Sequence, residues 1–112
     1  MSEIVKEVKR IDSATVVVAQ GEVTIEQSPA FHRALVDICA QSPKRLVIDL
    51  SGVSYIDSSG VGTLVEIFRR VNRGKGKMFL VGMTPTVRSV FEITKLDQFF
   101  PIFATEQEAL EA

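Results

Sequence analysis

Two hydroxyl side chains and a carboxylate lie together in the run Asp57-Ser58-Ser59-Gly60, near the middle of the chain. A helical apolar pattern follows, which places this run at a helix N-terminus. The first N–H groups of a helix have no internal partner and the helix dipole is positive there, so such a point accommodates a phosphate. Asp and Ser are also the commonest caps, so capping alone is the plainer interpretation. A serine at an exposed helix end can cap and still be open to a kinase.

The remaining composition leaves few other kinds of site. One cysteine, Cys39, and one histidine, His32, exclude an intramolecular disulfide, a multi-thiolate zinc site and a His-rich metal centre within one chain. We therefore expect no metal and no cofactor. An enzyme using Asp49, Asp57 and Ser58 remains an alternative. Against it stand the lack of a base nearby in the sequence and the small room for a substrate pocket in so short a chain.

The charge balance and the apolar runs limit the partners. Formal net charge is −1, from 13 Lys and Arg against 14 Asp and Glu, which argues against a general nucleic-acid surface. No apolar run reaches the roughly 18 to 20 residues that cross a bilayer, and the N-terminal residues lack a signal-peptide pattern. With a lone thiol, we expect a cytoplasmic protein with no membrane partner and no direct nucleic-acid partner. The cations of residues 69–77 are consistent with a site for an anionic partner or phosphate, or with a solvated helix end, and we favour the solvated helix end.

The elements that position the serines follow from changes in the hydrophobic period. Strands are predicted at residues 4–11, 14–19, 45–50, 77–81 and 99–103. A helix is predicted at residues 29–41 with Ser28 as its N-cap, and another at 58–73 with Gly74 in the position after it. Thr84-Pro85 is predicted to cap a third helix, and Thr105 with Glu108 has the spacing of a capping box before a fourth. Residues 51–58 are predicted to form a loop between the central strand and the second helix. Pro101 assigns the last strand to a sheet edge.

This order of elements predicts an α/β fold. We expect one domain over residues 1–112, with a mixed, mostly parallel sheet of about five strands, an antiparallel edge strand and about four helices. In open α/β sheets, functional groups gather beyond the carboxyl ends of the strands. The strand at 45–50 leads to Asp57 and Ser58, so the site is predicted at that edge of the sheet.

A longer segment around these serines is similar to a known family. Residues 47–62, with the sequence VIDLSGVSYIDSSGVG, resemble the signature of the STAS domain, in particular of bacterial anti-sigma factor antagonists. Gly21-Glu22-Val23 resembles the Gly-Glu-apolar motif of the family, and the resemblance covers essentially the whole chain. It implies the STAS fold and a regulatory binding protein, not an enzyme.

The resemblance also implies a switch. It assigns phosphorylation to Ser58, by an anti-sigma factor that is a serine/threonine kinase, with a serine/threonine phosphatase reversing it. The unphosphorylated protein is expected to bind the anti-sigma factor and so release the sigma factor for transcription. From chemistry alone, Ser59 is nearly as good an acceptor. Many family members carry Asp where this chain has Thr24. That difference leaves open the alternative of a STAS subunit in another signalling or lipid-transport assembly.

The predicted partner surface combines the start of the helix at 58–73 with the segments 51–57 and 21–27. Its residues, besides Ser58, are Glu22, Thr24, Asp49, Tyr55, Asp57, Ser59, Gly60 and Val61, with Leu64 as a further candidate contact. Asp49 is expected mainly to hold the 51–58 turn through hydrogen bonds to loop amides.

Overall fold

A five-stranded sheet organises the molecule, and the computed structural model describes residues 3–112. The strands are β1 (Val5–Ile11), β2 (Ala14–Val23), β3 (Arg45–Ile56), β4 (Lys77–Val81) and β5 (Ile102–Phe103). The helices are α1 (Ser28–Cys39), α2 (Ser58–Arg73), α3 (Pro85–Ile93) and α4 (Glu106–Glu111), with a 3₁₀ helix, η1 (Leu96–Gln98). The strands lie in chain order; β1 is antiparallel to β2 and the other pairs are parallel. The predicted α/β fold with an antiparallel edge strand is confirmed.

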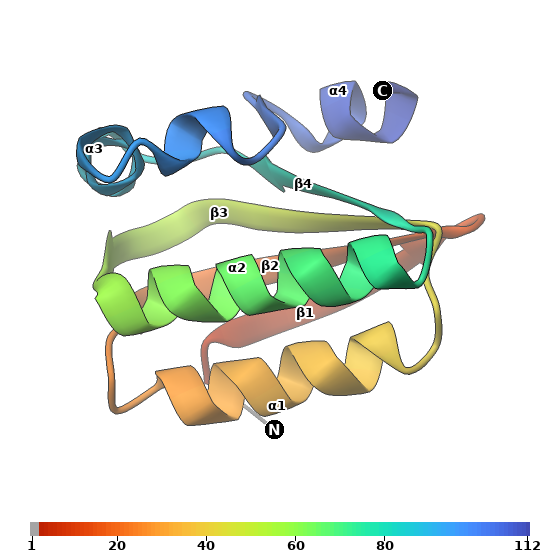
Figure 1. Cartoon of the computed structure of the whole chain (residues 1–112), viewed down its shortest axis with the longest axis horizontal. Helices are drawn as coiled ribbons and strands as arrows, with labels where there is room; N and C mark the ends of the chain where they lie inside the picture. The colour runs from red at the N-terminus through yellow and green to blue at the C-terminus, as the bar shows by residue number, and fades with distance from the viewer. Residues whose placement is uncertain (1–2) are drawn as a thin grey trace.

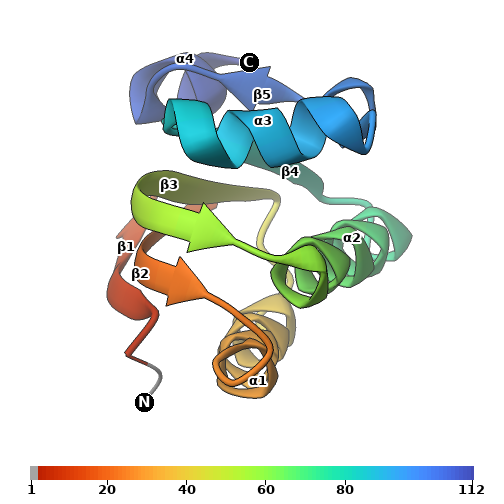
Figure 2. The same ribbon diagram turned by 90° about the vertical axis from the view of Figure 1, so that its left-hand side faces the viewer.

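Helices cover the two faces of the sheet unequally. Since parallel crossovers are right-handed and β2 to β5 follow one another across the sheet, the connecting helices are expected on one face. The larger core indeed packs α1, α2 and α3 against one face, and α1 and α2 lie side by side there (Figures 1 and 2). A smaller core under α4 covers the other face and contains Val47, Phe79 and Ala109.

The central strand β3 is longer than predicted, and the prediction of a loop at residues 51–58 is wrong. Residues 51–56 continue β3 beside β2, where Asp49 pairs with Val18 and Tyr55 with Glu22. Between these two pairs β3 has more residues than β2, so β3 carries bulges. Bulges bend a strand and disturb the alternation of its side chains between the two faces of the sheet. Val53 and Ile56 therefore both reach the core, although they are three residues apart. This spacing looked like a loop in the sequence.

Two helix ends also differ from the expected caps. Gln27, not Ser28, is the N-cap of α1, because the Ser28 hydroxyl donates back to the Thr24 carbonyl at 2.9 Å. Gly74 was expected in the position after the helix. It is instead the C-cap of α2, and Lys75 takes the left-handed conformation, with φ of 65°. The Thr84 cap and the Thr105–Glu108 capping box are confirmed.

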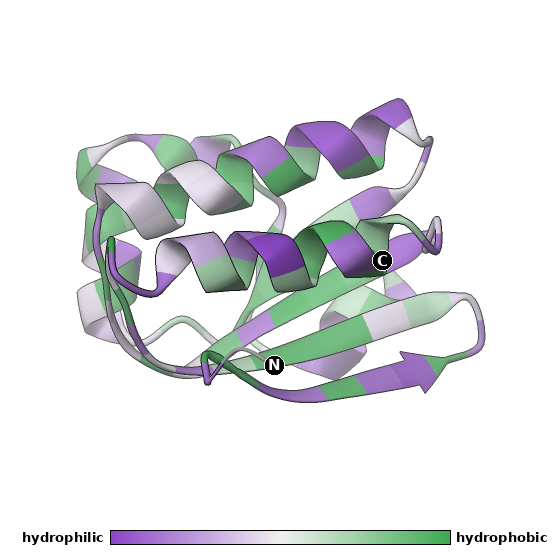
Figure 3. Cartoon of the chain, turned by 90° about the horizontal axis from the view of Figure 1, so that it is seen from below, coloured by the Kyte–Doolittle hydropathy of each residue, from purple (hydrophilic) through white to green (hydrophobic). Residues whose placement is uncertain are grey.

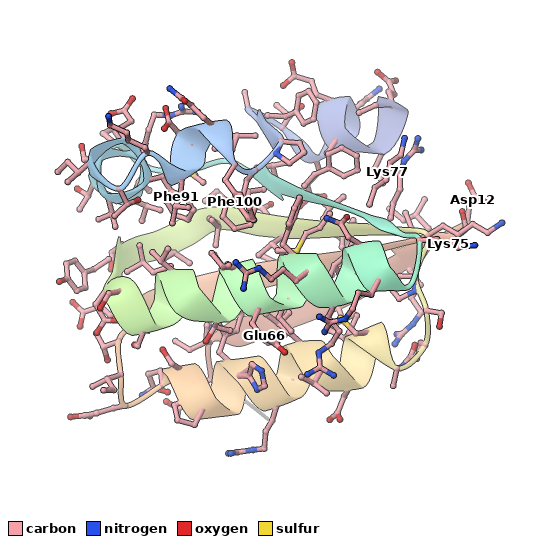
Figure 4. All side chains as sticks on the ribbon, viewed as in Figure 1. Asp12, Glu66, Lys75, Lys77, Phe91 and Phe100 are labelled. Carbon is pink, nitrogen blue, oxygen red and sulfur yellow. The ribbon has the colours of Figure 1, made fainter. Side chains whose placement is uncertain are left out.

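The last strand is shorter than the predicted span of 99–103. Only Ile102 and Phe103 pair with β4, at the edge of the sheet as expected. Phe100 turns into the core toward Phe91 (Figure 4), and the centroid of its ring lies 5.2 Å from that of Phe68 and 5.7 Å from that of Phe91. Because Phe100 makes these aromatic contacts, the segment before Ile102 does not alternate between the two faces of the sheet and does not form a strand.

Polar residues mark the opposite edge. β1 is mostly hydrophilic along its length, whereas β2 beside it is mostly hydrophobic (Figure 3). Charged side chains on an edge strand discourage pairing with another chain. Among residues 3–112, no helix combines the length and apolar character needed to cross a membrane.

The start of α2 approaches the end of β2 so closely that only glycine fits at position 60. A Cβ on Gly60 would lie 2.7 Å from Val23 Cγ1 and 2.7 Å from Ile56 Cγ1, whereas a Cβ on Gly62 meets nothing within 4 Å. We predict that Gly60→Ala lowers the free energy of unfolding by about 1–3 kcal/mol through overpacking. Gly62→Ala, the matched control, should raise it by about 0.5–1 kcal/mol. Equilibrium urea denaturation measures both, and equal effects would contradict the close approach.

Candidate functional site

The Asp57 carboxylate joins two segments at the carboxyl edge of the sheet. As the N-cap of α2, its Oδ1 accepts the N–H groups of Ser59 at 3.0 Å and Gly60 at 3.2 Å. Its Oδ2 accepts the N–H of Ile25, in the β2–α1 loop, at 3.0 Å. The hydrogen bond from the Ser59 hydroxyl, with those from the three N–H groups, holds the pKa of Asp57 below its ordinary value. One ionised side chain therefore fixes the loop against the helix start.

The Ser59 hydroxyl is fully engaged in this network. It donates to Asp57 Oδ1 at 2.5 Å and lies 2.8 Å from the hydroxyl of Ser28, a buried residue at the start of α1. Ser28 Oγ also lies 2.9 Å from the Thr24 carbonyl, so the one proton of Ser28 is shared between Ser59 Oγ and that carbonyl. The two hydroxyls thus link α1, the loop and α2, and Ser59 itself is half-buried. Its oxygen is poorly placed to react with another protein.

Ser58 has the opposite environment, although it is the next residue along the chain. It is the first residue of α2 and is exposed. Within residues 3–112, its side chain has no hydrogen-bond partner, unlike that of Ser59. The two serines, which the sequence could barely separate on chemistry, are therefore distinguished by their surroundings: one hydroxyl is held inside and the other is open to solvent.

Exposed apolar side chains accompany Ser58. Ile25 is 72% exposed and is bound through its N–H to Asp57, and Tyr55, near the end of β3, is 44% exposed. Glu22 pairs with Tyr55 in the β2–β3 ladder and is exposed, while Thr24 is half-buried. The predicted partner surface included the segment 21–27 but did not name Ile25. The sequence marks this residue only as an apolar residue between two polar ones. The prediction also missed Ser28 as a member of the network.

Four of the predicted surface residues lie elsewhere. Val61 and Leu64 are 5% and 0% exposed and belong to the core under α2, and Gly60 is buried. Asp49 accepts the Ser51 N–H at 2.9 Å, but both residues lie within β3, so the 51–58 turn that it was expected to hold does not form. It lines a depression beside α4, and the eight residues of strand up to Asp57 span on the order of 20 Å. The helical period buries Gly60, Val61 and Leu64, and the strand register places Asp49 away from the predicted partner surface.

A polar cluster links α1 to α2. Glu66 bonds Arg70 at 2.7 Å and His32 at 3.0 Å, and it lies between the two helices (Figure 4). Arg70 first, and then His32, hold the pKa of Glu66 below its ordinary value. His32 is therefore a helix–helix contact, far from Ser58. In the described part of the chain, His, Cys, Asp and Glu side chains form no group that could hold a metal ion.

The fold and the site define a small mixed-sheet α/β domain that presents a serine at the start of a crossover helix, beside a capping carboxylate. Residues 5–109 match the model of the STAS domain family. The chain belongs to the STAS domain family.

Two relatives of known structure cover nearly the whole chain, and a third relative covers two thirds of it. An anti-sigma factor antagonist from Mycobacterium paratuberculosis is 32% identical with a TM-score of 0.86, covering 94% of this chain and 89% of that one. The anti-sigma factor antagonist SpoIIAA in its unphosphorylated form is 25% identical with a TM-score of 0.71, covering 94% of each chain. The anti-sigma-B factor antagonist of Staphylococcus aureus is 26% identical over 76 residues, 68% of this chain and 70% of the relative.

The lowered pKa of Asp57 predicts a pH dependence of stability. A carboxylate with a folded pKa below its unfolded value of about 3.9 stabilises the fold above that value, and this contribution is lost as the pH falls through the folded pKa. Asp57→Asn keeps an accepting oxygen but cannot ionise. We expect the stability difference between the wild type and Asp57→Asn to be constant near neutral pH and to shrink below about pH 4. Urea denaturation across this range measures it, and a difference that does not change with pH would refute the charged cap.

The two serines should differ in their effect on stability. Ser59→Ala removes the hydroxyl that bonds Asp57 and Ser28 and should lower the free energy of unfolding by about 1 kcal/mol. Ser58→Ala, at the adjacent exposed position, should change it by less than about 0.5 kcal/mol. Urea denaturation compares the two, and an equal loss in both variants would show that the network does not distinguish them.

Proposed function

We propose that this chain is an anti-sigma factor antagonist switched by phosphorylation of Ser58. Unphosphorylated, it binds an anti-sigma factor that is a serine/threonine kinase, and so frees a sigma factor for transcription in the cytoplasm. A serine/threonine phosphatase reverses the modification. Family membership and the names of the relatives support this role. The observation that carries it is the exposed, unbonded Ser58 hydroxyl, next to a Ser59 hydroxyl held by Asp57 and Ser28.

Electrostatics at the start of α2 explains how phosphate would act. It adds about −1.5 to −2 charges at neutral pH. The N–H groups of Ser59 and Gly60 already bond Asp57, so these donors are not free to neutralise a phosphate on Ser58. The helix N-terminus, which was expected to accommodate the phosphate, therefore has two fewer free donors. The negative charge of the phosphate would lie beside the Asp57 carboxylate and face the partner.

The size of this effect is sufficient for a switch. A partner carboxylate about 5 Å from the phosphate, at an effective dielectric near 20, costs roughly 3 kcal/mol per unit charge. Even half of that cost lowers affinity by about tenfold. The bulk of the phosphate in a fitted interface adds to the loss. The switch needs no refolding, because a local change of charge at the docking surface is enough.

The proposed partner surface surrounds Ser58. Ile25 and Tyr55 provide exposed apolar area for an unphosphorylated contact, and Glu22 and Thr24 lie at its rim. Asp57 and Ser59 act from behind, by fixing the loop against α2. Aromatic and aliphatic anchors beside the modified hydroxyl mean that phosphate would disturb the contacts that dominate such interfaces.

We predict that a serine kinase from the same genome places phosphate on Ser58 and nowhere else. Mass spectrometry after incubation should find the phosphate in the wild type and in Ser59→Ala, and none in Ser58→Ala. Ser58→Asp should bind the kinase at least about tenfold more weakly than the wild type. Phosphate on Ser59, or equal binding by Ser58→Asp, would reject the proposal. A pull-down that returned transport subunits in place of a kinase would favour the alternative STAS assembly.

A further inference from the structure

The two ends of the sheet carry opposite charge. At the carboxyl end of β2, near the site, three exposed carboxylates and one exposed lysine line one depression: Glu3, Glu22 and Glu26, with Lys6. At the other end, where the parallel strands begin, lie four exposed cations, which we call the basic end: Lys44, Arg73, Lys75 and Lys77. The formal net charge of −1 conceals this separation.

The fold brings the basic end together from distant segments. Lys44 precedes β3, and its carbonyl accepts the N–H of Lys77, at the start of β4, at 2.9 Å. Arg73 is the last residue of α2, and Lys75 lies in the tight turn between α2 and β4. Lys75 and Lys77 lie at one end of the molecule, away from the start of α2 (Figure 4). The run of cations at residues 69–77 thus gains Lys44, which the sequence did not associate with it.

These four charges are not neutralised within the chain. Across residues 3–112, their side chains form no ion pair or hydrogen bond, whereas Arg70 in the same run pairs with Glu66. Asp12, in the β1–β2 turn, is a carboxylate at this end (Figure 4). Arg10, whose side chain bonds the neutral Gln41, offsets it. A cationic face therefore remains available to an anionic partner.

We propose that the basic end is a docking surface for an anionic lipid membrane. Each Lys or Arg near such a surface strengthens binding several-fold, so four together give roughly 10²- to 10³-fold. Ile11, the last residue of β1 at this end, is 41% exposed and adds an apolar side chain. A single-stranded nucleic acid fits less well, because the exposed Tyr and Phe side chains of the described residues, Tyr55 and Phe99, belong to other parts of the surface.

Docking at the basic end leaves the other end of the sheet facing the solvent. Ser58 and the partner surface would therefore stay accessible on a membrane-bound molecule. The inference is independent of the proposed function, since it involves no residue of that site. It departs from the expectation of no membrane partner, which depended on the lack of a spanning segment; a peripheral contact needs none.

The test is sedimentation of the full chain with phosphatidylcholine vesicles, with and without phosphatidylglycerol. We expect binding only with phosphatidylglycerol, and a loss of binding as salt is raised. Lys75→Glu/Lys77→Glu should weaken it by at least about tenfold. Arg88→Glu/Lys95→Glu makes the same charge change at two exposed positions in and after α3, and should retain most of the binding. Thermal melting checks that both variants fold.

Three outcomes would overturn the proposal. They are no sedimentation with phosphatidylglycerol at low salt, an equal loss in both double variants, and binding to a DNA or RNA oligonucleotide that is tighter than binding to the vesicles. The last would assign the basic end to a nucleic acid.

Discussion

The Asp57 carboxylate is the interaction on which the site depends. It accepts four hydrogen bonds, from the N–H groups of Ile25, Ser59 and Gly60 and from the Ser59 hydroxyl. Hydrogen bonds to an ionised acceptor are roughly twice as strong as neutral ones. Because they come from both the β2–α1 loop and the start of α2, they make one surface from two segments. They also engage the Ser59 hydroxyl and leave Ser58 as the open one.

The rest of the fold brings the partners of this carboxylate within reach. Bulges bend β3, so that its end meets the end of β2, where the Asp57 N–H bonds the Val23 carbonyl at 3.1 Å. Gly60 lets α2 begin directly against Val23. Between α1 and α2, Glu66 bonds His32, and nearer the site Ser28 of α1 lies beside Ser59 of α2. Core packing and polar contacts thus converge on the same short helix start.

The fold could be predicted from the sequence because its signals are local. Alternating strand and helix periods gave the element order, and Thr84 and Thr105 marked helix starts through cap chemistry that needs only near neighbours. The end of β3 was missed because bulges replace its alternation with a spacing of three residues. The end of the chain was misjudged because Phe100 follows aromatic contacts with Phe68 and Phe91, which are distant in the sequence.

The candidate site was predictable in position but not in detail. The motif located Asp57 and Ser58, but only three-dimensional contacts separate Ser58 from Ser59, since the deciding partner, Ser28, is far away in the chain. The same limit applies to burial. Val61 lies near Ser58 in the sequence, yet the helical period turns it into the core.

Amide hydrogen exchange tests the role of Asp57 most directly. Ile25 is exposed and lies in a loop, so protection of its N–H from exchange must come from the Asp57 carboxylate. We expect the amides of Ile25, Ser59 and Gly60 to be protected together in the wild type and to lose protection together in Asp57→Ala, while the amides of β3 stay protected. Rapid exchange at Ile25 in the wild type, or unchanged protection in the variant, would show that this carboxylate does not hold the loop to the helix.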